Sequence, residues 1–163
     1  MNTPYKQQRG FTIIEVVLVL AIAGLIFLMV FVALPSLQKG QRDAQRKTDL
    51  SRVQVQMQDY LNSTKGAAPT SDTALKKFIE NYLDGPANSF TAGDKFKNPK
   101  TGDPYVFKYD DAPSEGEIGY FNRASCKTDG TGTTEATGAS RDFAFSIKLE
   151  NQKAPFCIDN KSS

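Results

Sequence analysis

The residue of this 163-residue chain best placed for chemistry is a carboxylate, Glu15, because it stands in an otherwise apolar segment. It is the only charged residue between Phe11 and Pro35. A charge in a membrane-spanning helix costs roughly 2.5–3.5 kcal/mol at the helix centre and less near the end, so a buried carboxylate needs a positive partner. That partner would be a new amino terminus, made by cutting the chain just before Phe11, or a group on a neighbouring subunit.

The chain has no histidine and two cysteines, Cys126 and Cys157. Histidine is the commonest general base and metal ligand, so its absence argues against a conventional hydrolase. We therefore expect no catalytic residue, no cofactor and no metal site. Two thiols without histidine cannot complete a zinc site, and in an exported domain they favour a disulfide, with two unrelated buried thiols as the alternative.

Two groups of charged residues suggest other ligands. One is a set of carboxylates that could bind calcium, although their spacing does not match an EF-hand loop and solvated turn charges explain them better. These are Asp110, Asp111, Glu115 and Glu117. The other is a set of lysines interleaved with aromatic residues, which could contact nucleic acid through phosphates and stacking. These are Lys95, Lys97, Lys100 and Lys108 with Phe96, Tyr105 and Phe107.

The charge balance disfavours a nucleic-acid partner. Lysine and arginine total 20 against 18 acidic residues, and residues 53–163 hold 13 basic residues against 15 acidic ones. The basic excess lies instead in residues 36–52, with five basic residues against two acidic ones. This excess directly follows the apolar segment.

The apolar segment is long enough to cross a membrane. Residues 16–34 are all apolar except Gly24, and as a helix these 19 residues would be about 28 Å long. An ordinary secretory signal has a shorter apolar region, so we expect this segment to remain in the mature protein as a single span.

The orientation of the span follows from two opposing arguments. The basic residues after the span, taken alone, favour a cytoplasmic C-terminal side. The expected disulfide and the short polar head before the span favour the opposite orientation, which we adopt. The C-terminal part is therefore expected outside the cytoplasmic membrane.

The start of the chain resembles a known signal. Residues 6–15 read Lys-Gln-Gln-Arg-Gly-Phe-Thr-Ile-Ile-Glu, a short basic leader that ends in glycine, then phenylalanine, then glutamate before an uninterrupted apolar run. This pattern resembles the class III signal of type IV prepilins. The resemblance implies cleavage after Gly10 by a membrane prepilin peptidase, N-methylation of Phe11, and pairing of Glu15 with the terminal amine of an adjacent subunit. A plain signal anchor with one stray glutamate is the alternative.

The resemblance also implies a function. The chain would be a structural subunit, not an enzyme, that is held by membrane lipid, handed to the inner-membrane pilus assembly machinery and polymerised with copies of itself into an extracellular filament. A pseudopilin or minor pilin of a type II secretion or DNA-uptake machine is one alternative. A monomeric membrane-anchored binding module is another. Motility, adhesion, DNA uptake and secretion are all compatible with the signal.

We expect an α+β, type IV pilin-like fold with four parts: a leader (residues 1–10), a transmembrane and polymerisation helix (11–35), its amphipathic continuation (36–63) and a globular head (64–163). Pro35 should kink the helix, with melting of residues 24–35 on assembly as the alternative. The amphipathic part has an apolar stripe with helical spacing. Its members are Leu37, Ala44, Leu50, Val53, Met57, Tyr60 and Leu61.

The head is expected to contain one short helix and a sheet. Asp72 would cap the helix and Gly85 would end it. The helix would bury Leu75, Phe78, Ile79, Tyr82 and Leu83. Residues 105–109, 117–122 and 142–149 alternate as strands of an antiparallel sheet, and residues 125–140 have the composition of a surface loop. A last strand near residue 157 would close a C-terminal disulfide loop, as in certain bacterial pilins.

Overall fold

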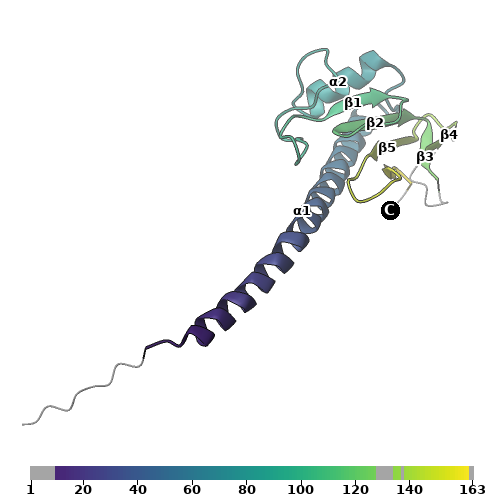
Figure 1. Cartoon of the computed structure of the whole chain (residues 1–163). Helices are drawn as coiled ribbons and strands as arrows, with labels where there is room; N and C mark the ends of the chain where they lie inside the picture. Colours follow the sequence, from purple (N-terminus) through teal and green to yellow (C-terminus); the bar gives the residue numbers. More distant parts are fainter. Residues whose placement is uncertain (1–9, 128–133, 137, 162–163) are drawn as a thin grey trace, which may run out of the picture. The chain divides into compact units, whose positions relative to one another are not determined.

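The computed structural model describes residues 10–127, 134–136 and 138–161. The chain forms two compact units, residues 1–38 and residues 39–163. The first helix, α1, is 51 residues long and covers Ile13–Ser63, so it contributes to both units (Figure 1).

The first unit is the apolar part of α1. Its large hydrophobic side chains are exposed, from Ile13 to Leu37, and its most apolar window has a mean hydropathy of 3.2 with no buried residues. The helix has the length and composition needed to cross a membrane. It is α-helical through both Gly24 and Pro35. The predicted kink at Pro35 and its alternative, melting on assembly, stay predictions.

The second unit packs the rest of α1 and helix α2 (Asp72–Tyr82) around a common core. On α1 the core residues Leu50, Val53, Met57 and Leu61 follow the helical period and are buried. The predicted stripe is wrong at its beginning, because Leu37 and Ala44 are exposed. Charged residues of α1 are buried there instead: Asp43, Arg46 and Asp49.

The N-cap of helix α2 lies one residue earlier than predicted. Its N-cap is Ser71, which has extended backbone angles and whose hydroxyl accepts a hydrogen bond from the Ala74 amide at 3.3 Å, so the prediction of Asp72 is wrong. Asp72 lies in the first turn, where a carboxylate favours the helix dipole. The predicted apolar face is correct: Leu75, Phe78, Ile79 and Leu83 are buried and Tyr82 packs against the core.

A four-stranded sheet completes the second unit, in the order β1-β2-β5-β6. The strands are β1 (Val106–Tyr109), β2 (Glu117–Asn122), β5 (Phe143–Ile147) and β6 (Phe156–Asp159). The pairs β2–β5 and β5–β6 are antiparallel. The expectation of a wholly antiparallel sheet is wrong at one edge, where β1 and β2 are parallel.

The parallel pair is possible because β1 is short. A strand of four residues is only about 13 Å long, and the connection of residues 110–116 can extend to about 23 Å. The connection can therefore return to the start of β1 without a crossover helix, although parallel pairs usually need a longer link. Gly116 has φ +85° at this point, a left-handed conformation that suits glycine.

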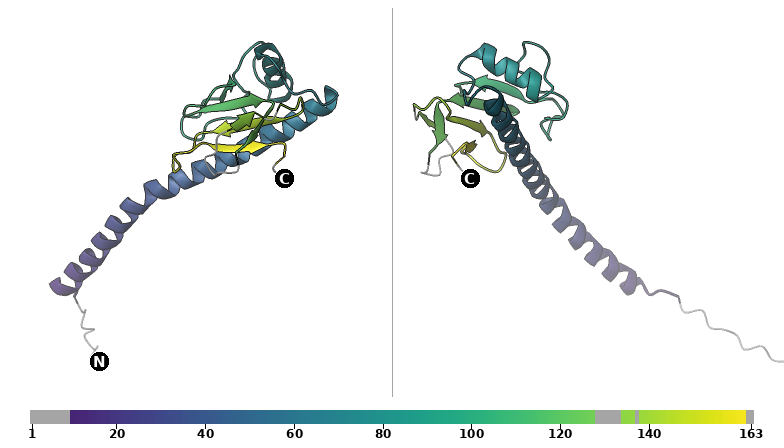
Figure 2. Two further views of the ribbon diagram at one scale, coloured as in Figure 1. Left: turned by 90° about the vertical axis from the view of Figure 1, so that its right-hand side faces the viewer. Right: turned by 180° about the vertical axis from the view of Figure 1, so that it is seen from behind.

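The two faces of the sheet have different coverings. One face holds the aromatic and aliphatic side chains of the core, including Phe107, Ile118, Tyr120 and Phe145, and meets the helices of the second unit. The other face is partly covered by a hairpin of β3 (Ala124–Cys126) and β4 (Thr134–Ala136) beside the sheet (Figures 1 and 2). The predicted surface loop 125–140 thus contains paired strands, and its residues 128–133 and 137 lie outside the described residues.

Candidate functional site

The start of α1 is built around Thr12 and Glu15. The Glu15 carboxylate accepts hydrogen bonds from the Thr12 backbone amide at 3.4 Å and from the Thr12 hydroxyl at 3.3 Å. In return, the Glu15 amide donates to the Thr12 hydroxyl at 3.4 Å. This is the reciprocal arrangement of a capping box, in which a threonine and a glutamate three residues later satisfy free amides at a helix N-terminus.

The cap explains why the helix begins at Ile13 and not at Phe11, and it adds a role for Glu15 that the sequence analysis missed. The Thr-x-x-Glu spacing was readable in the sequence as a capping signal. Only positive partners were considered for the carboxylate, so this local partner was not predicted. The partner is Thr12, a neutral group, so the need for a positive partner in an apolar environment remains.

The bond between Gly10 and Phe11 lies just before this cap. The Phe11 side chain is 87% exposed, and a Cβ added at Gly10 would meet no atom within 4 Å. The basic leader residues Lys6 and Arg9 lie outside the described residues. Gly10 and Phe11 thus lie outside the helix, and both are exposed.

Comparison with protein families adds one finding to this geometry. Residues 5–31 match the prokaryotic N-terminal methylation motif. The chain carries the class III prepilin signal of type IV pilins. None of the curated proteins or solved structures compared with the chain matches it significantly.

The prepilin signal and the fold agree. A long N-terminal helix followed by a small helix and an antiparallel-rich sheet is an α+β pilin-like fold. The motif supports a type IV pilin-like, prepilin-type protein, and a structural protein over an enzyme. It also implies processing by prepilin peptidase and is consistent with membrane anchoring through the apolar helix.

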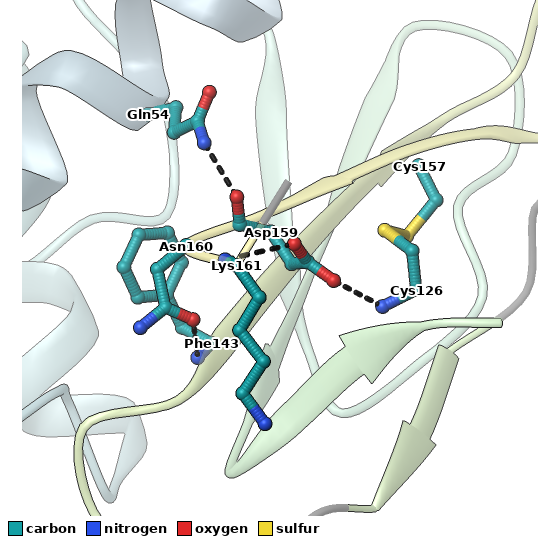
Figure 3. Close-up of a disulfide and its surroundings, with 7 residues drawn as sticks. All are labelled: Gln54, Cys126, Phe143, Cys157, Asp159, Asn160 and Lys161. Atoms are coloured by element: carbon teal, nitrogen blue, oxygen red, sulfur yellow. Dashed lines mark hydrogen bonds between the residues drawn. A yellow bond between two sulfur atoms is a disulfide. The ribbon is translucent and has the colours of Figure 1, made fainter. Parts of the chain in front are cut away.

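In the second unit (residues 39–163), called the head from here on, the two cysteines form a disulfide. Cys126 of β3 and Cys157 of β6 are joined across a sequence separation of 31 residues. Asp159 reinforces the same link, because its carboxylate accepts the Cys126 amide at 2.7 Å and its backbone carbonyl accepts the Gln54 side chain at 2.6 Å (Figure 3). The disulfide region is thus connected to both the hairpin and α1.

A second cluster in the head surrounds Arg46, whose side chain is fully buried. Its guanidinium donates to the side-chain oxygen of Asn98 at 3.0 Å and lies 3.2 Å from Glu150 and 3.4 Å from Glu115. A buried arginine is tolerated when carboxylates and hydrogen-bond acceptors surround it in this way. The cluster joins α1 to three loops of the head: the one before β1, the one between β1 and β2, and the one after β5.

The carboxylates of Glu150 and Asp43 in this cluster make further contacts. Arg42 makes a two-pronged pair with Glu150, with both N–O distances at 2.7 Å. The Asp43 carboxylate accepts the backbone amides of Glu150 at 2.8 Å and Asn151 at 2.9 Å. These bonds bind the segment after β5 to the first turns of the head portion of α1.

The same contacts shift the pKa values of the carboxylates. The hydrogen bond from Arg42 lowers the pKa of Glu150, and the hydrogen bond from Lys100 lowers the pKa of Glu115. Burial raises the pKa of Asp49, although Arg52 opposes the shift. Folding therefore lowers the pKa of Glu115 and Glu150 in the cluster and raises the pKa of Asp49 nearby on α1.

The Arg46 cluster was not predicted, because the buried face of α1 was predicted from apolar residues alone. Arg46, Leu50, Val53 and Met57 are spaced by four, three and four residues, so they share one face of α1. The spacing could have placed Arg46 on the buried face. Its partners on the distant loops could not be read from the spacing.

The four carboxylates considered for calcium have separate partners. Glu115 pairs with Lys100 at 2.7 Å, and Glu117 accepts the Ser114 amide at 2.9 Å. Asp110 accepts the Asn122 amide, and Asp111 accepts the Ala112 amide. Among the described residues there is no group of three or more potential metal ligands.

The four lysines considered for nucleic acid also have carboxylate partners, at 2.7–3.5 Å. The pairs are Lys95–Asp84, Lys97–Asp94, Lys100–Glu115 and Lys108–Glu117. The three aromatic residues between them, Phe96, Tyr105 and Phe107, are buried and cannot stack on bases. This geometry disfavours a nucleic-acid partner.

Proposed function

We propose that the chain is a filament subunit of a type IV pilus-like system, cut after Gly10, methylated at Phe11 and polymerised through its N-terminal helix. The observation that carries the proposal is the combination of the prepilin signal with an apolar helix whose side chains have no cover of their own. Such a surface must be covered by lipid before assembly and by other subunits afterwards.

Cleavage would create the missing partner for Glu15. The new amine of Phe11 on one subunit would pair with the Glu15 carboxylate of an adjacent subunit, and both groups lie at the start of the helix. The two cap bonds are long compared with an ordinary hydrogen bond of about 2.9 Å, so the carboxylate is only loosely held. In an apolar surrounding, an attraction between opposite charges exceeds that of a neutral cap, and it favours pairing with a terminal amine.

The charge also gives the filament a register. Along an apolar helix bundle, most displacements of one helix past another cost little, since apolar contacts are interchangeable. A single carboxylate that needs a single amine selects one axial position among them. We therefore assign Glu15 the role of an assembly residue, and Phe11 the role of its partner on an adjacent subunit.

The proposal is tested by processing and assembly together. Mass spectrometry of sheared surface filaments should find the chain beginning at an N-methylated Phe11, and electron microscopy should find filaments that contain it. Filaments built from chains that still begin at Met1 would overturn the cleavage step. Processed chains that stay single in the membrane would overturn polymerisation and favour an anchored binding module.

A further inference from the structure

A basic hollow of about 310 Å³ opens beside the Arg46 cluster, within the head unit. Three lysines from three separate segments line it: Lys39 on α1, Lys100 in the loop before β1, and Lys148 just after β5. The remaining lining residues are Glu115, Leu149, Glu150 and Gln152.

Arginine and lysine side chains already pair with the two carboxylates of the hollow. Glu150 is paired with Arg42 and Arg46, and Glu115 is paired with Lys100 and Arg46. Within the described part of the chain, neither Lys39 nor Lys148 pairs with a carboxylate within 4 Å, and both are exposed. The hollow therefore presents surplus positive charge, and the Gln152 amide adds a neutral donor. Its chemistry suits an anionic group with several oxygen acceptors, such as a phosphate.

The position of Lys39 in the chain restricts where that phosphate can come from. Lys39 follows Leu34, the last residue of the apolar run, by only five residues. Five residues extend to at most about 18 Å, whatever the arrangement of the two units, and to about 7.5 Å as a helix. The headgroups of the lipids around the span are thus within reach of the lysine.

We propose that this hollow binds the phosphate of an anionic phospholipid headgroup while the subunit is held in the membrane. The inference rests on the membrane-held stage of the proposed function, but it does not require polymerisation. Lys39 and Lys148 would contact the phosphate, and Arg42, Arg46 and Lys100 would cancel the nearby carboxylates. Juxtamembrane lysines attract anionic lipid in just this manner.

The first test uses the unassembled full-length subunit in nanodiscs of phosphatidylglycerol or phosphatidylcholine. Brief amine labelling, read by peptide mass spectrometry, measures the reactivity of each lysine. Lys39 and Lys148 should be protected in phosphatidylglycerol relative to phosphatidylcholine. Lys65 and Lys77 should not differ, because Lys65 follows the end of α1, Lys77 lies on α2, and neither is part of the hollow.

The second test measures lipid affinity by native mass spectrometry of the detergent-purified subunit. The double variant Lys39→Gln, Lys148→Gln should bind phosphatidylglycerol about twenty-five-fold more weakly, at about fivefold for each lysine. The matched control, Lys65→Gln with Lys77→Gln, removes the same charge elsewhere and should stay within about twofold of the parent.

Four results would overturn the inference. Equal protection in both lipids, or equal protection at all four lysines, would show general contact with the membrane. Equal protection by inorganic phosphate without lipid would indicate a site for a soluble anion. A subunit that does not enter nanodiscs would refute membrane anchoring and with it the inference. A subunit that enters them and binds the lipid but never polymerises would refute only the proposed filament.

Discussion

Helix α1 contributes charged side chains to both units of the chain, and these side chains differ in burial and in their partners. In the first unit, Glu15 is one carboxylate on an exposed apolar surface, held by two long hydrogen bonds from Thr12. In the head, Arg46 is fully buried and contacts Asn98, Glu115 and Glu150. Within the described part of the chain, Glu15 has no positively charged partner, whereas Arg46 pairs with the carboxylates of Glu115 and Glu150.

This difference assigns Glu15 to assembly and Arg46 to folding. A charge whose partners lie in the same chain contributes to the stability of that chain, as Arg46 does. A charge with only a weak local partner, in a segment that must enter an apolar environment, gains its largest stabilisation from another molecule. Variants of Glu15 should therefore change the polymer, and variants of Arg46 should change the stability of the head.

The largest expected effect concerns Glu15. Glu15→Ala and Glu15→Gln should both reduce the ratio of sheared filament to membrane-held subunit by more than about tenfold, because both remove the charge that selects the register. Insertion of the precursor into the membrane should be unimpaired in both. The ratio is measured by quantitative immunoblotting of sheared and membrane fractions, with the parent alongside.

Glutamine and threonine variants separate the charge from the cap. Glu15→Gln can keep the capping hydrogen bonds, since glutamine also serves in a capping box. Thr12→Ala removes the cap and keeps the charge, at a cost of about 1 kcal/mol in helix stability, and should retain most of the filament. If Thr12→Ala abolished filaments while Glu15→Gln preserved them, capping and not charge would be the function of Glu15.

The next largest effect concerns Arg46 in the head. Arg46→Met should lower the free energy of unfolding by about 3–5 kcal/mol, because it leaves buried acceptors and carboxylates without their shared donor. Urea unfolding of the detergent-purified chain, followed by the tyrosine signal, measures the change. Arg52→Met is the matched control on the same helix, since the Arg52 side chain is 49% exposed and should contribute about 1 kcal/mol or less. Equal losses of unfolding free energy in both variants would contradict the claim that burial makes Arg46 the more important arginine.

The disulfide should have a somewhat smaller effect on the same stability. Closing a loop of this length contributes about 3.7 kcal/mol in the chain-entropy model, and native strain usually reduces the value. We therefore expect the double variant Cys126→Ser, Cys157→Ser to lose about 2–4 kcal/mol. Thiol labelling of the parent should fail without reductant, and ready labelling of both cysteines in the folded protein would disprove the link.

The smallest effect concerns acid. The pKa values of Glu115 and Glu150 are lowered in the folded head, so their contribution to stability is present above their ordinary value of 4.5 and is lost as the pH falls below it. Asp49 has a raised pKa and opposes this loss, because its protonation relieves a burial cost. The free energy of unfolding should therefore fall moderately between about pH 5 and pH 3. Glu115→Gln should flatten this fall, and an unchanged slope would rule out Glu115 as a source.

Much of this protein could be predicted from residues close together in the sequence. The apolar run, the glycine–phenylalanine junction and Glu15 lie within one short segment, so their spacing alone indicates the signal and the helix. The short helix after Ser71 and three of the strands were also predicted, because their apolar periods are local. Even the capping box at Thr12 was present as a local pattern, although it was overlooked.

The tertiary structure alone decided how distant segments meet. Arg46 on α1 meets Glu150 more than 100 residues later, and no local period records that pairing. The same holds for the parallel edge of the sheet, since a strand's alternation is identical in both directions and only the length of its return connection allows β1 to run beside β2. Local spacing reports which face of an element is buried, whereas the partner on that face depends on where the rest of the chain folds back.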